Sequence, residues 1–135
     1  MDSSKDQAIS LKALHGRKVV VIDDVPFSRL LPGMVLRPFG VEVFEFSNAL
    51  DVFPVLKTHP ILCILLDIAM PGTDGIEALK LLKSSGLLNT TRVIAYTAYA
   101  DGEESKRLIN LGFDSVLLKP IKSQDLLEIL NSSDN

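Results

Sequence analysis

Two kinds of segment alternate along the chain from Lys18 onward, and this alternation constrains the fold more than any other feature of the sequence. One kind is short, apolar and rich in β-branched residues. Three of these short stretches are continuous apolar runs, which are typical of strands buried on both faces of a parallel sheet. Another carries Glu42 and Glu45, which favours a place nearer the sheet edge. The five predicted strands cover residues 19–22, 41–46, 61–66, 93–97 and 116–118.

The second kind of segment is longer and amphipathic, with apolar residues at helical spacing. Apolar stripes run through 76–82, 108–111 and 126–130, and further helices are predicted at about 26–37 and 49–57. This strict alternation predicts an α/β fold: a single doubly wound, five-stranded parallel sheet with five helices and right-handed crossovers.

Pro32 and Gly33 fall inside the first predicted helix. An interior proline removes a backbone hydrogen bond and costs about 3 kcal/mol. We therefore predict a kink or a short non-helical step near residues 29–33.

Length and composition place the chain among ordinary single-domain globular proteins. Its 135 residues suffice for one buried core, and 47% hydrophobic with 23% charged residues is usual for that class. We expect residues 1–16 to form an N-terminal extension or linker, residues 17–131 to form the domain, and residues 132–135 to form a tail. Ordered structure is expected to begin at Lys18.

Charge and cysteine content limit the partners and the location. The net charge of −3 leaves no basic surplus for a phosphate backbone, so direct nucleic-acid binding is not expected. No apolar stretch reaches the ~18 residues of a membrane-spanning helix, and no signal peptide is recognisable. The single cysteine, Cys63, lies in an apolar run and is expected to be a buried thiol in a reducing compartment. We therefore expect a cytoplasmic protein without membrane insertion.

Polar side chains stand where the predicted strands end. Three carboxylates, one hydroxyl and one ammonium take these places: Asp23, Asp24, Asp67, Thr97 and Lys119. Each alone has a structural explanation, since an aspartate or threonine there often caps the next helix and a lysine is often solvated. Together they meet at one edge of a parallel sheet, where α/β folds bind ligands. Three carboxylates repel one another unless a cation lies among them, and an all-oxygen site favours Mg²⁺.

Four runs of the sequence resemble the receiver domain of two-component response regulators. They are Val20–Asp24, Leu65–Gly75, Thr97–Ala98 and Lys119–Pro120. The resemblance covers about residues 17–131, and the central Asp-x-x-Met-Pro-x-x-Asp-Gly run is its most specific part. It implies the flavodoxin-like strand order 2-1-3-4-5, of which the chemotaxis receiver is a known example.

The resemblance implies a phosphoacceptor switch in a two-component phosphorelay. Asp67 would be the nucleophile that takes a phosphoryl group from a phosphohistidine and becomes an aspartyl phosphate. Lys119 would pair with the phosphoryl oxygens, and the Thr97 hydroxyl would move to hydrogen-bond the phosphoryl group. The Lys119–Pro120 peptide bond would be cis.

The resemblance also implies a cofactor and partners. Asp24 and Asp67 would bind Mg²⁺ directly, Asp23 would bind it through a water, and the backbone carbonyl of Ala69 would be a further ligand. The chain would not be a dedicated enzyme, although it would catalyse its own Mg²⁺-dependent phosphorylation and its own dephosphorylation. The implied partner is a sensor histidine kinase or a histidine phosphotransfer protein. A downstream protein target and a homodimer stay open.

The sequence departs from the receiver pattern at one position. Receivers commonly carry Tyr or Phe three residues before the lysine of the last strand, and this chain has Val116. The alternative hypothesis is therefore a receiver-like interaction scaffold that does not switch. Tyr99, two residues after Thr97, is a candidate ring at the same surface. Asp74 and Gly75 are interpreted as structural, with Gly75 needed for a positive φ or for a close approach.

A flavin- or nucleotide-binding enzyme of similar topology is a third hypothesis, and the sequence argues against it. The loop after the first strand, residues 23–26, is acidic and would repel phosphate without a metal. The sequence has no glycine-rich dinucleotide motif and no Walker A motif. Both histidines, His15 and His59, lie outside the strand-end cluster, so a Ser-His-Asp triad or a zinc site lacks its residues.

Overall fold

A five-stranded parallel sheet forms the middle layer of this computed structural model, which describes residues 13–69 and 74–131. The strands are β1 (Lys18–Ile22), β2 (Glu42–Phe46), β3 (Cys63–Asp67), β4 (Arg92–Thr97) and β5 (Ser115–Leu118). They lie in the order β2-β1-β3-β4-β5, and every neighbouring pair is parallel. The expected flavodoxin-like order is confirmed.

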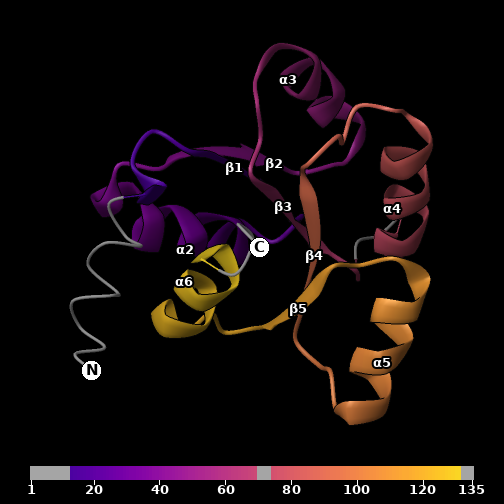
Figure 1. Cartoon of the computed structure of the whole chain (residues 1–135). Coiled ribbons are helices and arrows are strands. Elements are labelled where there is room, and N and C mark those ends of the chain that lie inside the picture. The colour runs from indigo at the N-terminus through magenta and orange to yellow at the C-terminus, as the bar shows by residue number, and fades with distance from the viewer. Residues whose placement is uncertain (1–12, 70–73, 132–135) are drawn as a thin grey trace.

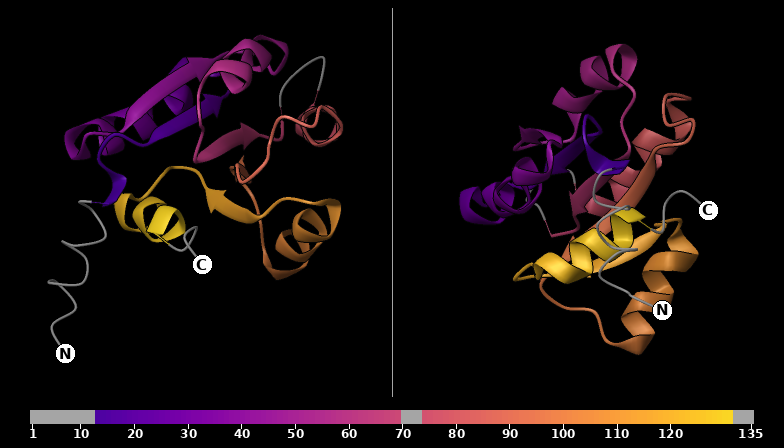
Figure 2. Two further views of the ribbon diagram at one scale, coloured as in Figure 1. Left: turned by 45° about the horizontal axis from the view of Figure 1, so that its top comes forward. Right: turned by 60° about the vertical axis from the view of Figure 1, so that its left-hand side comes forward.

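Five helices follow the strands: α2 (Pro26–Leu36), α3 (Phe53–Thr58), α4 (Gly75–Ser84), α5 (Gly102–Leu111) and α6 (Ser123–Asn131). Short 3₁₀ turns, Arg37–Phe39 and Leu50–Val52, follow α2 and precede α3. Helices α2 and α6 cover one face of the sheet, and α3, α4 and α5 cover the other (Figures 1 and 2). This is the doubly wound arrangement that the sequence predicts. Among the described residues, no helix is both long enough and apolar enough to cross a membrane.

The strands are apolar throughout because their two faces belong to two different core clusters. In β1, Val20 and Ile22 pack with α3, α4 and α5, whereas Val19 and Val21 pack with α2 and α6. All four side chains are fully buried. Strand β2 lies at an edge of the sheet, as predicted, and its Glu42 is exposed.

Helix α2 continues through Pro32, so the predicted non-helical step is wrong, whereas the kink stays a prediction. Proline lacks the N–H that would reach the carbonyl of Ser28 one turn earlier. The hydroxyl of Tyr96, from β4, donates to that carbonyl over 3.0 Å. Because the Ser28 carbonyl has this other donor and Pro32 itself is buried, tertiary contacts offset the cost that local propensity assigns to proline.

Ordered packing begins before Lys18, which corrects the expectation that order starts there. Leu14 is buried in the same cluster as Leu36, and the N–H of Gly16 donates to the carbonyl of Gly40 over 2.8 Å. The chain just ahead of β1 is therefore held against the domain. The rest of the predicted extension (residues 1–12), the motif positions 70–73 and the tail (132–135) lie outside the described residues.

Candidate functional site

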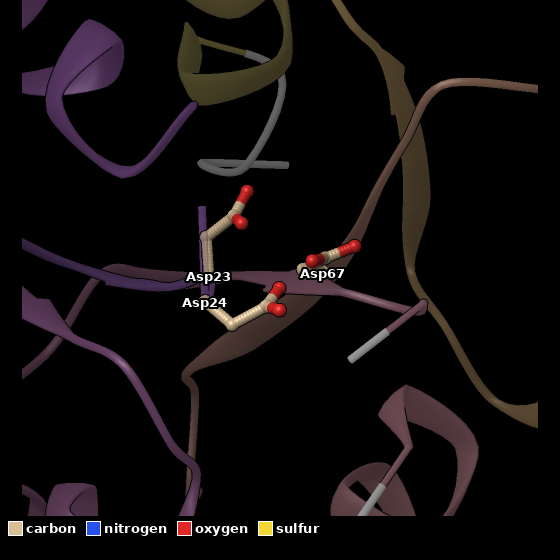
Figure 3. A group of neighbouring side chains, drawn as sticks. All are labelled: Asp23, Asp24 and Asp67. Carbon is tan, nitrogen blue, oxygen red and sulfur yellow. The ribbon is translucent and has the colours of Figure 1, made fainter. Parts of the chain in front are cut away.

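Three aspartates lie at the carboxyl ends of β1 and β3, where these two strands pair. Ile22 is the register partner of Leu66, so Asp23 and Asp67 follow at neighbouring places. One carboxylate oxygen from each of Asp23, Asp24 and Asp67 can be chosen so that all lie within 4.8 Å of one another (Figure 3). The parallel sheet thus gathers acids that are 44 residues apart in sequence. The predicted acidic cluster is present.

Lys119, the residue directly after β5, supplies positive charge to this cluster. Its Nζ lies 2.8 Å from Asp23 Oδ2 and 3.4 Å from Asp67 Oδ1. The lysine side chain is only 16% exposed and that of Asp23 is fully buried, so solvent screens this pair weakly. The Lys119–Pro120 peptide bond is cis, as predicted.

The capping explanation of Asp23 does not hold. Helix α2 has Val25 at its N-cap, with no side-chain cap hydrogen bond. Asp23 Oδ1 instead accepts from the N–H of Val25 over 2.9 Å, and its Oδ2 is turned to Lys119. The Asp23 carboxylate is therefore held by its own loop while one oxygen faces the site.

Asp74 does cap a helix, which confirms its structural interpretation. Its side chain accepts from the N–H of Glu77, at 2.9 Å, in the first turn of α4. Gly75 is required for a close approach: a Cβ there would collide with the backbone of Ile68 and lie 2.7 Å from the carbonyl oxygen of Asp67. This contact packs the start of α4 against the loop that follows Asp67.

Burial and negative neighbours dominate the electrostatics of Asp67, which is 3% exposed. Burial raises its pKa from 3.8 to about 6, and the charge of Asp23 adds to this. The N–H of Ala69, which donates to Asp67 Oδ1 over 3.1 Å, and the Lys119 ammonium lower the pKa and only partly compensate. The site therefore carries more negative charge than its surroundings neutralise.

A hard divalent cation fits this donor set. Asp23 Oδ2 is buried and, apart from the ion pair with Lys119, makes no hydrogen bond. The three aspartates offer carboxylate oxygens, the ligand type that Mg²⁺ prefers. Additional positive charge would also relieve the repulsion between Asp23 and Asp67.

Comparison with known proteins agrees with this geometry. The family model of the response regulator receiver domain matches residues 19–131, most of the chain. The chain belongs to this family. Receiver domains are the phosphoacceptor modules of two-component systems, so the chain is one such signalling module.

The relatives place this receiver domain beside those of large sensor kinases. The sensor histidine kinase GacS of Pseudomonas protegens is 28% identical over 131 residues, which is 95% of this chain and 14% of that protein. The sensor histidine kinase RcsC of Escherichia coli K12 is 34% identical over 118 residues, 87% of this chain and 12% of RcsC. The chain therefore spans about one seventh of GacS and about one eighth of RcsC.

A solved structure shares the fold. The chemotaxis protein CheY4 of Vibrio cholerae superposes with a TM-score of 0.77 at 22% identity, covering 87% of this chain and 98% of that one. A likeness at this level of identity supports the architecture of the receiver domain rather than its partners.

The hydroxyl expected to report phosphorylation lies at the end of β4. Thr97 follows Tyr96, the register partner of Asp67, and is 6% exposed. Its Oγ1 accepts from the N–H of Tyr99 at 3.2 Å and donates to the carbonyl of Tyr99 at 3.1 Å. The Tyr99 ring is exposed, and its hydroxyl donates to Asp101 over 2.8 Å. Val116 packs partly buried against the cluster on the α3–α5 face.

The structure also reveals two contributors that sequence reasoning missed. Arg29, in the first turns of α2, donates to the carbonyl of Asp23 over 2.9 Å. The ring of Tyr96 lies beneath the Lys119 ammonium, with Nζ 4.8 Å from the ring centroid. A signal for Tyr96 was present in the sequence: it carries a polar hydroxyl directly after the apolar run Val93–Ala95.

Proposed function

We propose that this receiver domain accepts a phosphoryl group on Asp67 from a phosphohistidine. The observation that carries the proposal is the meeting of Asp67 with two further carboxylates and the Lys119 ammonium at one sheet edge. A carboxylate oxygen of Asp67 attacks phosphorus while the bond from phosphorus to the imidazole nitrogen breaks. The electron pair leaves with the imidazole, and the product is an aspartyl phosphate. Attack of water on phosphorus later releases phosphate and restores the carboxylate.

Charge neutralisation is the main task of the site in this reaction. Phosphoryl transfer needs positioning and positive charge around the equatorial oxygens, with little other chemistry. Lys119 lies 3.4 Å from Asp67 Oδ1 and can turn its ammonium from Asp23 to the incoming phosphoryl oxygens. Positive charge beside Asp67 also favours its ionised, nucleophilic form.

We propose Mg²⁺ as the cofactor, held by Asp24, Asp67 and the carbonyl of Ala69, with Asp23 acting through a water. When bound, the ion supplies positive charge to the attacking and transferred oxygens. The buried Asp23 Oδ2, which makes no hydrogen bond apart from its ion pair with Lys119, supports a cation at this place. The N–H of Ala69 already donates to Asp67, so the residue stands beside the nucleophile.

Thr97 is proposed to convert phosphorylation into a surface change. The added phosphoryl group carries a charge of roughly −1.5 to −2 and strong acceptor oxygens. The Thr97 hydroxyl would leave the backbone of Tyr99 and donate to the phosphoryl group, which frees the loop after β4 to move. Val116 supports the competing candidate, a scaffold that does not switch, because it offers no ring to follow Thr97 inward.

The proposed phosphodonor is a sensor histidine kinase or a histidine phosphotransfer protein, in line with the named function of GacS and RcsC. Helix α2 begins two residues after Asp24 of the acidic cluster, so its start lies at the edge of the site that a partner would approach. Val25, Phe27 and Leu30 are exposed there and offer apolar contact area. A homodimer, a downstream target protein and a cytoplasmic location stay predictions.

Intact-protein mass spectrometry after incubation with acetyl phosphate and Mg²⁺ tests the proposal. Asp67→Asn is the test variant and Asp74→Asn is the matched control, since Asn caps a helix as well as Asp. We expect an adduct of one phosphoryl group in the wild type and in the control. The adduct is expected to disappear with EDTA and in Asp67→Asn.

The negative outcomes separate the two candidate functions. Absence of both an adduct and Mg²⁺ binding by titration would establish the non-switching scaffold. Absence of an adduct despite Mg²⁺ binding would call for beryllofluoride, which forms a stable mimic where rapid hydrolysis hides the phosphoryl group. Failure to form that complex would overturn the proposal.

A further inference from the structure

Tyr96 joins the phosphoacceptor site to helix α2. It is fully buried in β4, beside Asp67 in the sheet register. Its ring lies under the Lys119 ammonium, at 4.8 Å from Nζ to the centroid. Its hydroxyl points to the other side and donates to the carbonyl of Ser28 in α2 over 3.0 Å. One side chain therefore touches both the cation of the site and a helix on the surface.

The sequence of α2 leaves one backbone carbonyl without its helical hydrogen-bond donor, and the Tyr96 hydroxyl takes the place of that donor. In a regular helix the Ser28 carbonyl would accept from the N–H of residue 32, but that residue is proline and has none. The Ser28 carbonyl is partly shielded from water, so leaving it without a donor would be costly, and Tyr96 supplies the donor from another element. Pro32 and Tyr96 are thus complementary: the one removes a local hydrogen bond and the other replaces it over a sequence separation of 68 residues.

The hydroxyl remains a donor over the physiological pH range. Burial, with the charges of Asp23 and Asp67 added to it, raises the pKa of Tyr96 to about 12. Burial, helped by the charges of the site, therefore keeps Tyr96 neutral, and ionisation does not break the link to Ser28.

Lys119 has three neighbours at once: the carboxylates of Asp23 and Asp67, and the face of the Tyr96 ring. Cation–π attraction between an ammonium and a ring is strengthened when both are shielded from water, as here. A phosphoryl group on Asp67 would compete for the ammonium and draw it from its present place. The ring would then lose or change the contact that fixes it.

We propose that Tyr96 is a positioning residue that holds Lys119 by its ring and α2 by its hydroxyl, so that phosphorylation of Asp67 is transmitted to α2. The proposal rests on the proposed function of Asp67. It assigns to this chain a second route of output, separate from Thr97 and from the position of Val116. The signal reaches the exposed apolar side of α2, formed by Phe27, Leu30 and Met34.

A double-mutant cycle tests the static part of the link, without any phosphoryl donor. Tyr96→Phe keeps the ring and removes the hydroxyl, and we expect the unfolding equilibrium constant to rise about fivefold. Pro32→Ala restores a backbone N–H for Ser28. The gain from Pro32→Ala is expected to be several-fold larger in the Tyr96→Phe background than in the wild type, because only there is the carbonyl without a donor. Strictly additive effects would overturn the link. Tyr99→Phe, which loses an exposed tyrosine hydrogen bond, is the control and should couple to nothing.

NMR amide shifts on adding Mg²⁺ and beryllofluoride test the transmission. In the wild type we expect shifts around Asp67 and Thr97 and also along α2. In Tyr96→Phe the α2 shifts are expected to fall by at least half while those at Asp67 and Thr97 persist. The double variant Tyr96→Phe with Pro32→Ala should regain stability without regaining the α2 shifts. If the role of Tyr96 were purely structural, the α2 shifts would return together with the stability.

The other possible NMR results distinguish failure of the transmission to α2 from failure of the proposed function of Asp67. Undiminished α2 shifts in Tyr96→Phe, or no α2 shifts in the wild type, would overturn the transmission and leave the proposed function standing. No response at Asp67 in the wild type would overturn the proposed function and the transmission with it, whereas the stability cycle would still report on the bond to Ser28.

Discussion

Replacing Asp67 with asparagine is expected to stabilise the metal-free domain at neutral pH, even though it removes a partner of Lys119. The reason is that the folded chain binds the Asp67 proton more tightly than the unfolded chain does. Burial raises the pKa of this carboxyl from 3.8 to about 6, and the nearby charge of Asp23 adds to the effect. Asparagine has nearly the same shape and no charge to bury. Lys119 keeps its shorter contact, to Asp23.

The magnitude follows from proton linkage. A raised pKa contributes stability below pH ~4, where both states are protonated, and this contribution is lost as the pH rises through 6. A difference of about two pH units between the pKa values corresponds to ~3 kcal/mol, at about 1.4 kcal/mol per unit. The stabilisation by Asp67→Asn should therefore be small at pH 4, grow between pH 4 and pH 6, and level off above that range.

Urea unfolding in EDTA, measured at several pH values from 4 to 8, is the assay. The quantity compared is the difference in the free energy of unfolding between variant and wild type, in which the titration of other carboxyls largely cancels. Asp74→Asn is the control, because it removes an exposed carboxylate and keeps the helix cap. Its free energy of unfolding should stay within a few tenths of a kcal/mol of the wild type at every pH.

Mg²⁺ should offset most of this difference in stability. A ligand that binds only the folded state adds about 2.7 kcal/mol at one hundred times its dissociation constant. Wild type should gain this and Asp67→Asn should gain less, since it lacks one carboxylate. A pH-independent difference, or an Asp67→Asn variant less stable than the wild type at pH 7 in EDTA, would refute the reasoning about burial.

Three further expectations concern single residues. Asp74→Ala should lower the free energy of unfolding by ~1 kcal/mol, because the N–H of Glu77 loses its acceptor, while the yield of phosphoryl adduct stays unchanged by mass spectrometry; an unchanged urea midpoint would count against the cap. Gly75→Ala should lower the free energy of unfolding by at least ~2 kcal/mol and slow the formation of the phosphoryl adduct, because a methyl group would collide with the backbone of Ile68 beside Asp67. A variant as stable as the wild type would show that the backbone of Ile68 can move away from residue 75. Cys63 is buried and burial raises the pKa of its thiol to about 12, so a thiol reagent at pH 8 should label it only after unfolding, and rapid labelling of the native protein would contradict its burial.

Much of the site could be predicted because it depends on local patterns. Continuous apolar runs imply strands buried on both faces, and such strands are parallel in α/β folds. Parallel strands bring their carboxyl ends to one edge of the sheet. Asp23 and Asp67, which each stand at the end of a predicted strand, were therefore expected at the same edge. The same argument placed Lys119 nearby, and the structure puts its ammonium 2.8 Å from Asp23.

Two structural predictions from local sequence patterns were wrong, and in both cases a contact with a distant part of the chain explains the observed structure. Pro32 has a poor local propensity, yet α2 is continuous across it because Tyr96 supplies the missing donor. The expectation for the region before β1 failed similarly, since Leu14 finds a place in the core beside Leu36. Neither partner can be identified from residues near it in the sequence.

The amino-acid sequence by itself determined the strand and helix order, the sheet type and the set of polar groups at the sheet edge. These follow from the period of apolar residues and from the direction of parallel strands, both of which are local properties. Only the tertiary structure decided which oxygen of Asp23 faces Lys119, how closely Gly75 approaches the loop after Asp67, and that Tyr96 spans from Lys119 to Ser28. Those features depend on rotamers and on distances between elements, which are set when the whole core packs at once.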